Sequence, residues 1–294
     1  MPRATAERAN SSGTCASPPQ YRTRPGGFRY SVRAHAARPD EELTVPTPLL
    51  AYRDPQFIES EDGRPIRIVS EYLAPLRSLR DAGVSATVVF FGSARVQARG
   101  PLGRYYEEAC ELARLVTEWS QKKCDGRLIV CSGGGPGIME AANRGAQLAG
   151  GRSIGLNIGL PHEQRPNRYV TEGLCYEFHY FFMRKLWFAH LAHGLIAFPG
   201  GFGTFDELFE ILTLAQTRKL DRQIPVFLYG SAYWNEVVNF DALVRHGTIA
   251  AEDLQLFEFV DEPQAALARL QSRMPPPPAE PRVAFAKSRC GPGT

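Results

Sequence analysis

The sequence predicts an α/β fold, a doubly wound, Rossmann-like parallel sheet with helices on both faces. Short apolar runs of four to six residues alternate with segments in which apolar residues recur at helical spacing, between about residues 66 and 260. Three of the runs end in turns that contain glycine. Continuous apolar strands separated by helices are typical of a parallel sheet that is buried on both sides.

The expected elements follow one another along the chain. A helix at about 66–82 comes first, because its apolar residues recur at helical spacing and Gly83 follows it. The strands are expected at 87–91, 128–131, 153–158, 174–178, 195–198, 224–228 and 257–260. The helices between them are expected at 103–121, from the 133–135 turn through residue 142, and at 181–192, 204–216 and 233–246.

The composition predicts one folded domain between two tails. Residues 1–45 are rich in Arg, Pro, Ser, Gly and Ala without periodicity, which predicts a disordered basic tail. Residues 273–294 contain a run of four prolines and predict a second disordered, Pro-rich tail. Residues 55–272 are expected to form a single Rossmann-type domain.

The charge distribution argues against a nucleic-acid partner. The chain carries a formal charge of +3, but residues 1–40 alone hold seven Arg against two acids, or +5, so the remainder is about −2. No apolar run approaches the roughly 20 residues that span a bilayer, so we expect no membrane partner. Six scattered cysteines without zinc-type spacing favour a reducing, cytoplasmic location. The Arg-rich N-terminus also fits a transit peptide, which is the less favoured alternative.

Three turns at the ends of expected strands carry the candidate chemistry. They are Gly92-Ser93-Ala94-Arg95, the glycine turn at 133–137 and the Pro-Gly-Gly turn that begins at Pro199. Glycine lets backbone approach a ligand closely, and the N-terminus of the following helix attracts phosphate. Ligands of such sheets bind at the carboxyl ends of the strands, so the turns predict a nucleotide or sugar-phosphate site. Plain strand-to-helix connections are the alternative.

Standard phosphate motifs do not account for these turns. Residues 133–137 do not match GxGxxG, and no acid ends the next strand to hold a ribose, so a nicotinamide-dinucleotide site is weakly supported. The chain also contains no GxxxxGK[ST] motif, which excludes a P-loop NTPase.

Two of the segments carry a family resemblance. The string from Gly133 to Asn143 (GGGPGIMEAAN) and the string from Pro199 to Glu207 (PGGFGTFDE) resemble the two signature motifs of the LOG family. That family comprises cytokinin riboside 5′-monophosphate phosphoribohydrolases and related bacterial nucleotide nucleosidases. Arg184-Lys185 resembles its Arg-Lys element, and the resemblance spans about 65–262. Plant-type members have Met-His before Arg-Lys where this chain has Phe182-Met183, so the chain is more similar to the longer bacterial subgroup.

The resemblance implies catalytic roles for Glu207 and Arg184. Hydrolysis of an N-glycosidic bond builds positive charge on the ribose, which a carboxylate such as that of Glu207 stabilises while it orients water. The pattern Thr204-x-x-Glu207 also fits a capping box, in which Glu207 would only bond back to the helix start. The guanidinium of Arg184 suits phosphate or a sugar oxygen, and a solvated helix charge is its alternative.

Further residues are expected to bind substrate. The helix start at Thr204 is expected to hold the 5′-phosphate. The full set of expected binding residues is Ser93, Gly134, Gly135, Met139, Glu140, Lys185, Gly201, Phe202, Gly203 and Thr204. For Glu140, an ion pair with Arg144 is the alternative.

The predicted activity is therefore hydrolysis of a nucleoside 5′-monophosphate, AMP or N6-modified AMP, to free base and ribose 5-phosphate. Water, a carboxylate and a phosphate clamp suffice for it, so no metal or organic cofactor is expected. The resemblance also implies a homodimer. The alternative function is a non-catalytic protein that binds a nucleotide-like ligand or carries the molybdenum cofactor. Members of the family have been labelled lysine decarboxylases, but no separate feature of the sequence indicates a pyridoxal-phosphate site.

Overall fold

A seven-stranded sheet organises the protein. The computed structural model describes residues 48–160, 165–220 and 222–274, and all elements below belong to the unit that begins at Leu49. The strands are β1 (Ala86–Phe91), β2 (Leu128–Ser132), β3 (Ser153–Ile158), β4 (Cys175–Phe178), β5 (Ala192–Ala197), β6 (Val226–Tyr229) and β7 (Phe257–Val260). The predicted tail at 1–45 lies outside the described residues, as does the tail at 273–294 apart from its first two residues.

The sheet is parallel throughout and has the strand order β4-β3-β2-β1-β5-β6-β7. The chain therefore builds outward from β1 to β4 and then returns to place β5 on the other side of β1. Such a reversal of strand order opens a crevice between the ends of the two central strands. The predicted doubly wound α/β fold is confirmed, and its switch point lies between β1 and β5.

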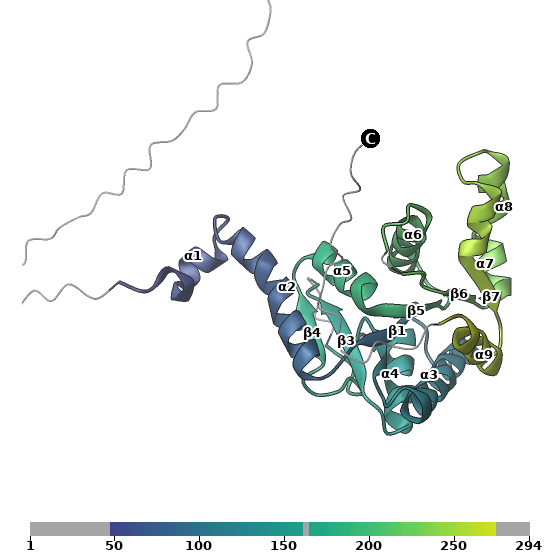
Figure 1. Cartoon of the computed structure of the whole chain (residues 1–294), viewed down its shortest axis with the longest axis horizontal. Helices are drawn as coiled ribbons and strands as arrows, with labels where there is room; N and C mark the ends of the chain where they lie inside the picture. The colour runs from purple at the N-terminus through teal and green to yellow at the C-terminus, as the bar shows by residue number, and fades with distance from the viewer. Residues whose placement is uncertain (1–47, 161–164, 221, 275–294) are drawn as a thin grey trace, which may run out of the picture. The chain divides into compact units, whose positions relative to one another are not determined.

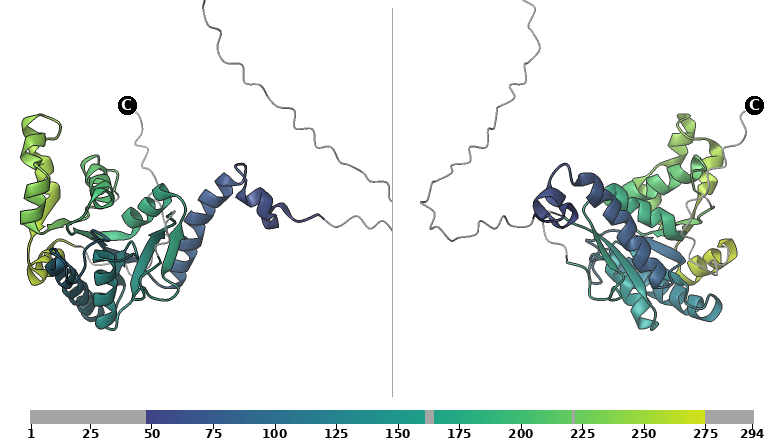
Figure 2. Two further views of the ribbon diagram at one scale, coloured as in Figure 1. Left: turned by 180° about the vertical axis from the view of Figure 1, so that it is seen from behind. Right: turned by 60° about the vertical axis from the view of Figure 1, so that its left-hand side comes forward.

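Helices cover both faces of the sheet (Figures 1 and 2). One layer contains α3 (Gly103–Lys123), α4 (Ile138–Leu148) and α9 (Pro263–Arg273). The other contains α2 (Arg64–Asp81), α5 (Phe181–Leu191), α6 (Phe202–Gln216), α7 (Ser231–Val237) and α8 (Phe240–Arg245). Short helices complete the fold: η1 (Ala51–Arg53), α1 (Pro55–Glu59) and η2 (Ala251–Leu256).

The central strand β1 supplies both hydrophobic cores. Val88 and Phe90 pack with the layer of α3, α4 and α9, whereas Val89 and Phe91 pack with the opposite layer. All four side chains are at most 5% exposed. Successive side chains of a strand point to opposite faces, so an uninterrupted apolar run is what a strand buried on both sides requires.

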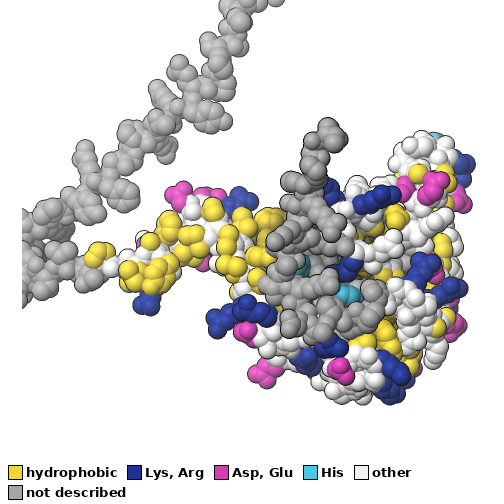
Figure 3. Space-filling view, in the orientation of Figure 1, with side chains coloured by type: hydrophobic (Ala, Val, Ile, Leu, Met, Phe, Trp, Pro, Cys, Tyr) yellow, Lys and Arg dark blue, Asp and Glu magenta, His cyan; other side chains and the backbone are white. Residues whose placement is uncertain are grey.

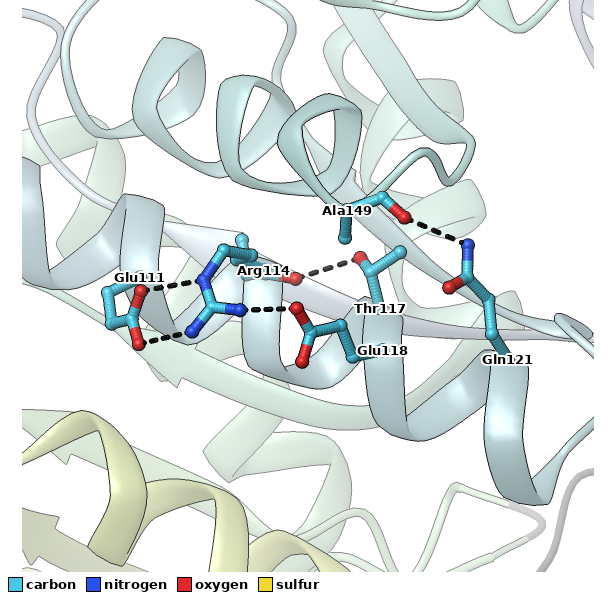
Figure 4. Close-up of polar contacts among 7 residues, drawn as sticks. Glu111, Arg114, Thr117, Glu118, Gln121 and Ala149 are labelled. Carbon is cyan, nitrogen blue, oxygen red and sulfur yellow. Dashed lines mark hydrogen bonds and ion pairs between the residues drawn. The ribbon is translucent and has the colours of Figure 1, made fainter.

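Helices α3 and α4 pack closely because a glycine lies between them. A Cβ added at Gly145 would lie 2.0 Å from the carbonyl oxygen of Cys110, so only glycine allows this approach. At the far end of α3, Gln121 donates a hydrogen bond of 3.1 Å to the carbonyl of Ala149 (Figure 4). The outer surface of α3 carries a charged group in which Arg114 lies between Glu111 and Glu118.

The structure corrects two predicted helices. The single helix expected at 233–246 is two short ones, because Asn239 interrupts it and its side chain accepts a 2.9 Å hydrogen bond from the Ala242 N–H, which caps α8. Helix α6 begins at Phe202 rather than at 204. Helix α9 was not expected as an element.

Apolar side chains gather on the outer surface of the N-terminal helices (Figure 3). Six of these side chains are more than one-third exposed: Leu49, Leu50, Tyr52, Ile66, Val69 and Leu73. Within the described residues, no helix is long and apolar enough to cross a membrane.

One carboxylate of α2 anchors the start of α5. Glu71 Oε1 accepts a hydrogen bond of 2.7 Å from the His179 N–H, and its Oε2 accepts one of 3.2 Å from the Tyr180 N–H. The backbone carbonyl of the same residue accepts from the Trp187 indole N–H at 3.1 Å. A negative charge at this position also suits the positive end of the α5 dipole.

We predict that Glu71→Ala lowers the free energy of unfolding by about 1–3 kcal/mol, because two backbone N–H groups lose a charged acceptor. Urea unfolding followed by circular dichroism would measure the change. Glu61→Ala is the control, since Glu61 is exposed and sits in the turn before α2. Equal unfolding midpoints for the two variants would contradict the anchoring role of Glu71.

Candidate functional site

A cleft of about 880 Å³ lies at the carboxyl ends of β1, β2, β3 and β5. Its walls come from the turn after β1, the glycine turn after β2, the end of β3, and the start of α6. Helices α5 and α7 supply further side chains, Phe181 and Arg184 from the first and Tyr233 and Val237 from the second. This position coincides with the switch point of the sheet, where doubly wound folds bind ligands.

The N-terminus of α6 faces this cleft. Gly201 is the N-cap, and its carbonyl accepts from the N–H groups of Thr204 and Phe205 at 2.9 and 3.0 Å. The N–H groups of Phe202 and Gly203, at the first two helical positions, have no acceptor one turn earlier in the helix. A Cβ added at Gly201 or Gly203 would meet nothing within 4 Å, so the backbone here borders open space. The geometry suits an anion.

Gly200 and Thr204 fix the shape of this turn. A Cβ at Gly200 would lie 2.1 Å from Oγ1 of Thr204, so the glycine lets the buried threonine pack directly on the turn. The Tyr233 hydroxyl donates a 2.6 Å hydrogen bond to the carbonyl of Gly200. The Trp234 indole N–H, shared between the carbonyls of Ala197 and Tyr229 at 3.1 Å each, holds the ends of β5 and β6 beneath the turn.

Glu207 and Arg184 meet inside the cleft. Arg184 Nη1 lies 3.9 Å from Glu207 Oε1, and the two side chains are 14% and 9% exposed. Arg184 Nε donates a 2.8 Å hydrogen bond to the carbonyl of Leu156, and its guanidinium lies 5.2 Å from the ring centre of Phe188. The arginine is thereby held in place, while the carboxylate of Glu207 still borders the open space of the cleft.

Burial dominates the electrostatics of this pair. Desolvation raises the pKa of Glu207 to about 7, although the positive charges of Arg184 and Lys185 act in the opposite direction. Desolvation also lowers the pKa of the Arg184 guanidinium from its ordinary value, and the charge of Glu207 opposes that change. A carboxyl that titrates near neutral pH in a cleft is typical of catalytic sites.

Glu207 is not part of a helix cap. Because α6 begins at Phe202, Thr204 is the third helical residue and Glu207 lies more than a turn into the helix. The backbone of Gly201 caps the helix without a side-chain hydrogen bond. The capping-box alternative is therefore wrong.

The glycine turn after β2 is shaped around Arg184. A Cβ at Gly133 would lie 2.4 Å from Arg184 Nη2 and 2.6 Å from Met139 Sδ. Gly134 has a φ of 72°, a conformation that favours glycine. The Asn167 side-chain amide donates to the carbonyls of Gly134 and Gly135 at 3.0 and 2.9 Å, which fixes the turn from behind.

The turn after β1 connects the other two. The Ser93 N–H donates to the carbonyl of Pro199 at 3.0 Å, and the Ser93 carbonyl accepts from the Ile138 N–H at 3.1 Å. Ser93 Oγ accepts a 3.0 Å hydrogen bond from the Arg95 N–H, so the hydroxyl proton remains available to donate. Hydrogen bonds thus join all three turns that the sequence singled out.

The structure brings most of the expected residues to the cleft. Those that line it are Ser93, Met139, Arg184, Gly201, Phe202, Gly203, Thr204 and Glu207. Lys185 instead contacts Asp206 at 2.8 Å and Glu210 at 3.1 Å, outside the cleft.

Three further expected residues do not line the cleft. Glu140 accepts a 2.9 Å hydrogen bond from the Tyr106 hydroxyl. This contact differs both from the expected contact with substrate and from the alternative ion pair with Arg144. Gly134 and Gly135 are buried behind the lining and engage Asn167 through their carbonyls.

Sequence reasoning missed several lining residues. Gly133 belonged to a recognised motif but was not expected to border Arg184. Asn157 at the end of β3 and Tyr233 on α7 gave no local signal, because an isolated Asn or Tyr next to an apolar segment has no distinctive spacing. Arg95 follows Ser93 at the cleft and could have been found from its position at a strand end.

The chain is similar in sequence to several known proteins. A family model described as "Possible lysine decarboxylase" matches residues 139–270. A rice protein (Oryza sativa subsp. japonica) named "Probable cytokinin riboside 5′-monophosphate phosphoribohydrolase LOGL5" is 26% identical over 191 residues, covering 64% of this chain and 72% of that protein.

Two further likenesses are more limited. The "Pyrimidine/purine nucleotide 5′-monophosphate nucleosidase" of Escherichia coli K12 is 30% identical over 161 residues, and the match covers 51% of this chain but only 34% of that protein. The solved structure of a Moco carrier protein from Chlamydomonas reinhardtii covers 65% of this chain and 99% of that protein, at 21% identity and a TM-score of 0.42.

The match to the family model covers the α6 turn, Glu207 and the helix that carries Arg184, and it begins after the Gly92–Arg95 and Gly133 turns. The rice and Escherichia coli relatives carry the names of the two activities that the resemblance to the LOG family implies.

Proposed function

We propose that the protein hydrolyses the N-glycosidic bond of a nucleoside 5′-monophosphate, AMP or N6-modified AMP, and releases the free base and ribose 5-phosphate. The observation that carries the proposal is the carboxylate of Glu207, buried beside Arg184 in the cleft and just behind the anion-binding start of α6. The names of the rice and Escherichia coli relatives support the same reaction class.

We assign a part of the substrate to each wall of the cleft. The 5′-phosphate is held by the N–H groups at the start of α6, with the hydroxyls of Ser93 and Thr204 beside it. This places the ribose over Glu207, one turn further along the same helix. The base then lies toward the apolar wall that Ile158, Leu160 and Phe181 form.

Glu207 then acts on the bond that breaks. As the base leaves, positive charge grows on the ribose ring, and an ionised carboxylate against the ring stabilises that charge. The same carboxylate orients the attacking water. Arg184 cannot leave its hydrogen bond to Leu156 without losing a buried contact, so it acts as a fixed charge that keeps Glu207 in place beside the sugar.

The description attached to the family model does not fit the cleft chemistry. Pyridoxal-phosphate decarboxylases need a lysine that forms a Schiff base with the cofactor. Among the described residues, none of those lining the cleft is a lysine, and Lys185 on the neighbouring helix is engaged by Asp206 and Glu210. We therefore do not propose decarboxylation.

A homodimer that pairs through α6 is part of the proposal. The outer surface of this helix carries a shallow groove of about 470 Å³ lined by Phe205, Phe209, Thr213 and Leu214, among others. Phe202 at its end is 96% exposed. Partly exposed apolar side chains in one patch beside the cleft suit a second copy of the chain. We also propose a cytoplasmic location, which the unpaired thiols of Cys110, Cys124, Cys131 and Cys175 support.

We predict that Glu207→Gln lowers kcat for AMP by about 10²- to 10⁴-fold, because the charge that stabilises the transition state is lost. AMP binding should persist, since the α6 turn remains. Chromatographic detection of adenine and ribose 5-phosphate would measure the rate. Glu210→Gln is the matched control on the same helix, and its activity should stay near that of the unmodified protein.

A screen of common and N6-modified monophosphates with the unmodified protein tests the reaction class itself. Release of a base from any of them supports the proposal. Tight AMP binding without release of base from any substrate would instead favour the carrier alternative.

The pKa of Glu207 predicts the pH dependence. Below about pH 7 the carboxyl of the free enzyme is protonated and neutral, and above it the active carboxylate dominates. We expect kcat/KM for AMP to rise with pH, with a midpoint near 7, and to level off above it. Rate profiles between pH 5 and 9 would measure this. A profile that falls across that range would mean that the protonated form of Glu207 is active.

For the dimer, we predict that Thr213→Arg converts the protein to monomers, because it adds charge and bulk at an exposed position in the α6 groove. Light scattering coupled to size-exclusion chromatography would measure the mass, and circular dichroism would verify the fold. If the unmodified chain is already monomeric at micromolar concentration, the proposed interface is wrong.

A further inference from the structure

Arg95 is a cation at the cleft whose charge nothing in the described structure engages. It lines the cleft from the turn after β1 and is exposed to solvent. Its backbone N–H bonds to Ser93 Oγ at 3.0 Å, but among the described residues its guanidinium has no ion pair or hydrogen bond. An arginine held at a cleft with five free donors is suited to a phosphate.

The second arginine of the cleft is committed elsewhere. Arg184 is largely buried, donates from Nε to the Leu156 carbonyl and lies beside Glu207. Its Nη2 lies against Gly133, where a Cβ would lie 2.4 Å away, and its Nη1 faces Glu207. Its charge is therefore largely balanced by Glu207 before any ligand binds.

The net charge of the cleft lining is too small to balance a doubly charged phosphate unless Arg95 takes part. The charged side chains of the described lining are Arg95, Arg184 and Glu207, which sum to +1 when Glu207 is ionised. A phosphate monoester carries about −1.5 to −2 near neutral pH. The dipole at the start of α6 supplies only about half a positive charge. Arg95 is the group of the lining that remains to balance the phosphate.

The backbone places Arg95 close to that helix start. Ser93 donates from its N–H to the carbonyl of Pro199 at 3.0 Å, so the turn that carries Arg95 lies directly against the turn that begins α6. The carbonyl of Ser93 is tied to the start of α4 through the Ile138 N–H at 3.1 Å. Arg95 therefore extends from a turn that is fixed on both sides, while its side chain reaches solvent.

We infer that Arg95 is the phosphate-recognition residue of the cleft, which makes the site selective for nucleoside 5′-monophosphates over the corresponding nucleosides. The inference rests on the proposed function for the identity of the ligand. Arg95 acts on binding and not on bond cleavage, because the reacting carbon lies over Glu207 and not over the phosphate.

Binding in a protein that cannot turn over substrate tests this assignment. The full chain with Glu207→Gln is titrated with AMP and with adenosine by calorimetry, alone and combined with Arg95→Met, Arg95→Lys or Arg99→Met. Arg99 is the matched control, because it is an exposed arginine of the same loop that does not line the cleft.

We expect Arg95→Met to raise the Kd of AMP about 10- to 100-fold and to change the Kd of adenosine by less than about twofold, since one charge-assisted contact is lost. Arg95→Lys should recover part of the affinity, because it keeps the charge without the planar fork. Arg99→Met should leave both constants unchanged.

Two results would overturn the inference. A parallel loss of AMP and adenosine affinity in Arg95→Met would show a structural role for the side chain. An AMP affinity that falls no further in Arg95→Met than in Arg99→Met would show only a diffuse charge effect. Failure of the proposed hydrolysis would be seen separately, because the unmodified protein would release no adenine from AMP. If AMP binding still depended on Arg95 in that case, the inference would stand.

Discussion

Burial of the Glu207 carboxyl is the constraint on which the rest of the site depends. With its pKa raised to about 7, the folded protein retains a proton that the unfolded chain releases from about pH 4.5 upward. The free energy of unfolding therefore falls as pH rises between these two values, and ionised Glu207 is maintained at a cost in stability. The opposite charge of Arg184 at 3.9 Å reduces that cost.

The fold supports this pair from several directions. Arg184 reaches the cleft from α5, whose start is held by Glu71 of α2. Glu207 reaches it from α6, which starts at the end of β5 next to β1. Because β1 and β5 flank the switch point, the turns that follow these two strands lie side by side without a long loop. The glycines of these turns leave the room that charged side chains and ligand occupy.

Much of the fold followed from local patterns. Strands such as β3 and β7 have the predicted bounds, because apolar runs with flanking glycine or polar residues delimit them. The break between α7 and α8 was missed, since the capping role of Asn239 competes with an apolar periodicity that continues through it. Helix α9 was also missed, although Pro263 at its first turn and the spacing of Ala266 and Leu270 fit a helix start and a buried face.

The part of the site that lies in local sequence motifs was predictable. Glu207, Arg184 and the α6 turn could be predicted because each belongs to a motif of contiguous residues. Asn157, Tyr233 and the contacts of Lys185 depend on how distant segments pack, which one sequence does not reveal. The capping-box alternative failed because a glycine backbone, rather than Thr204, begins the helix.

The absence of a side chain at Gly133 has an evolutionary consequence. Positions 133 and 184 are 51 residues apart in the chain, yet the absence of a side chain at Gly133 leaves the space that the Arg184 guanidinium fills. A methyl group at 133 would meet the side-chain ends of Arg184 and Met139 rather than backbone, so the fold would survive if the guanidinium moved out of its present position. The two positions should therefore covary among homologues, with glycine tolerated widely but larger residues at 133 found only where the arginine has been replaced.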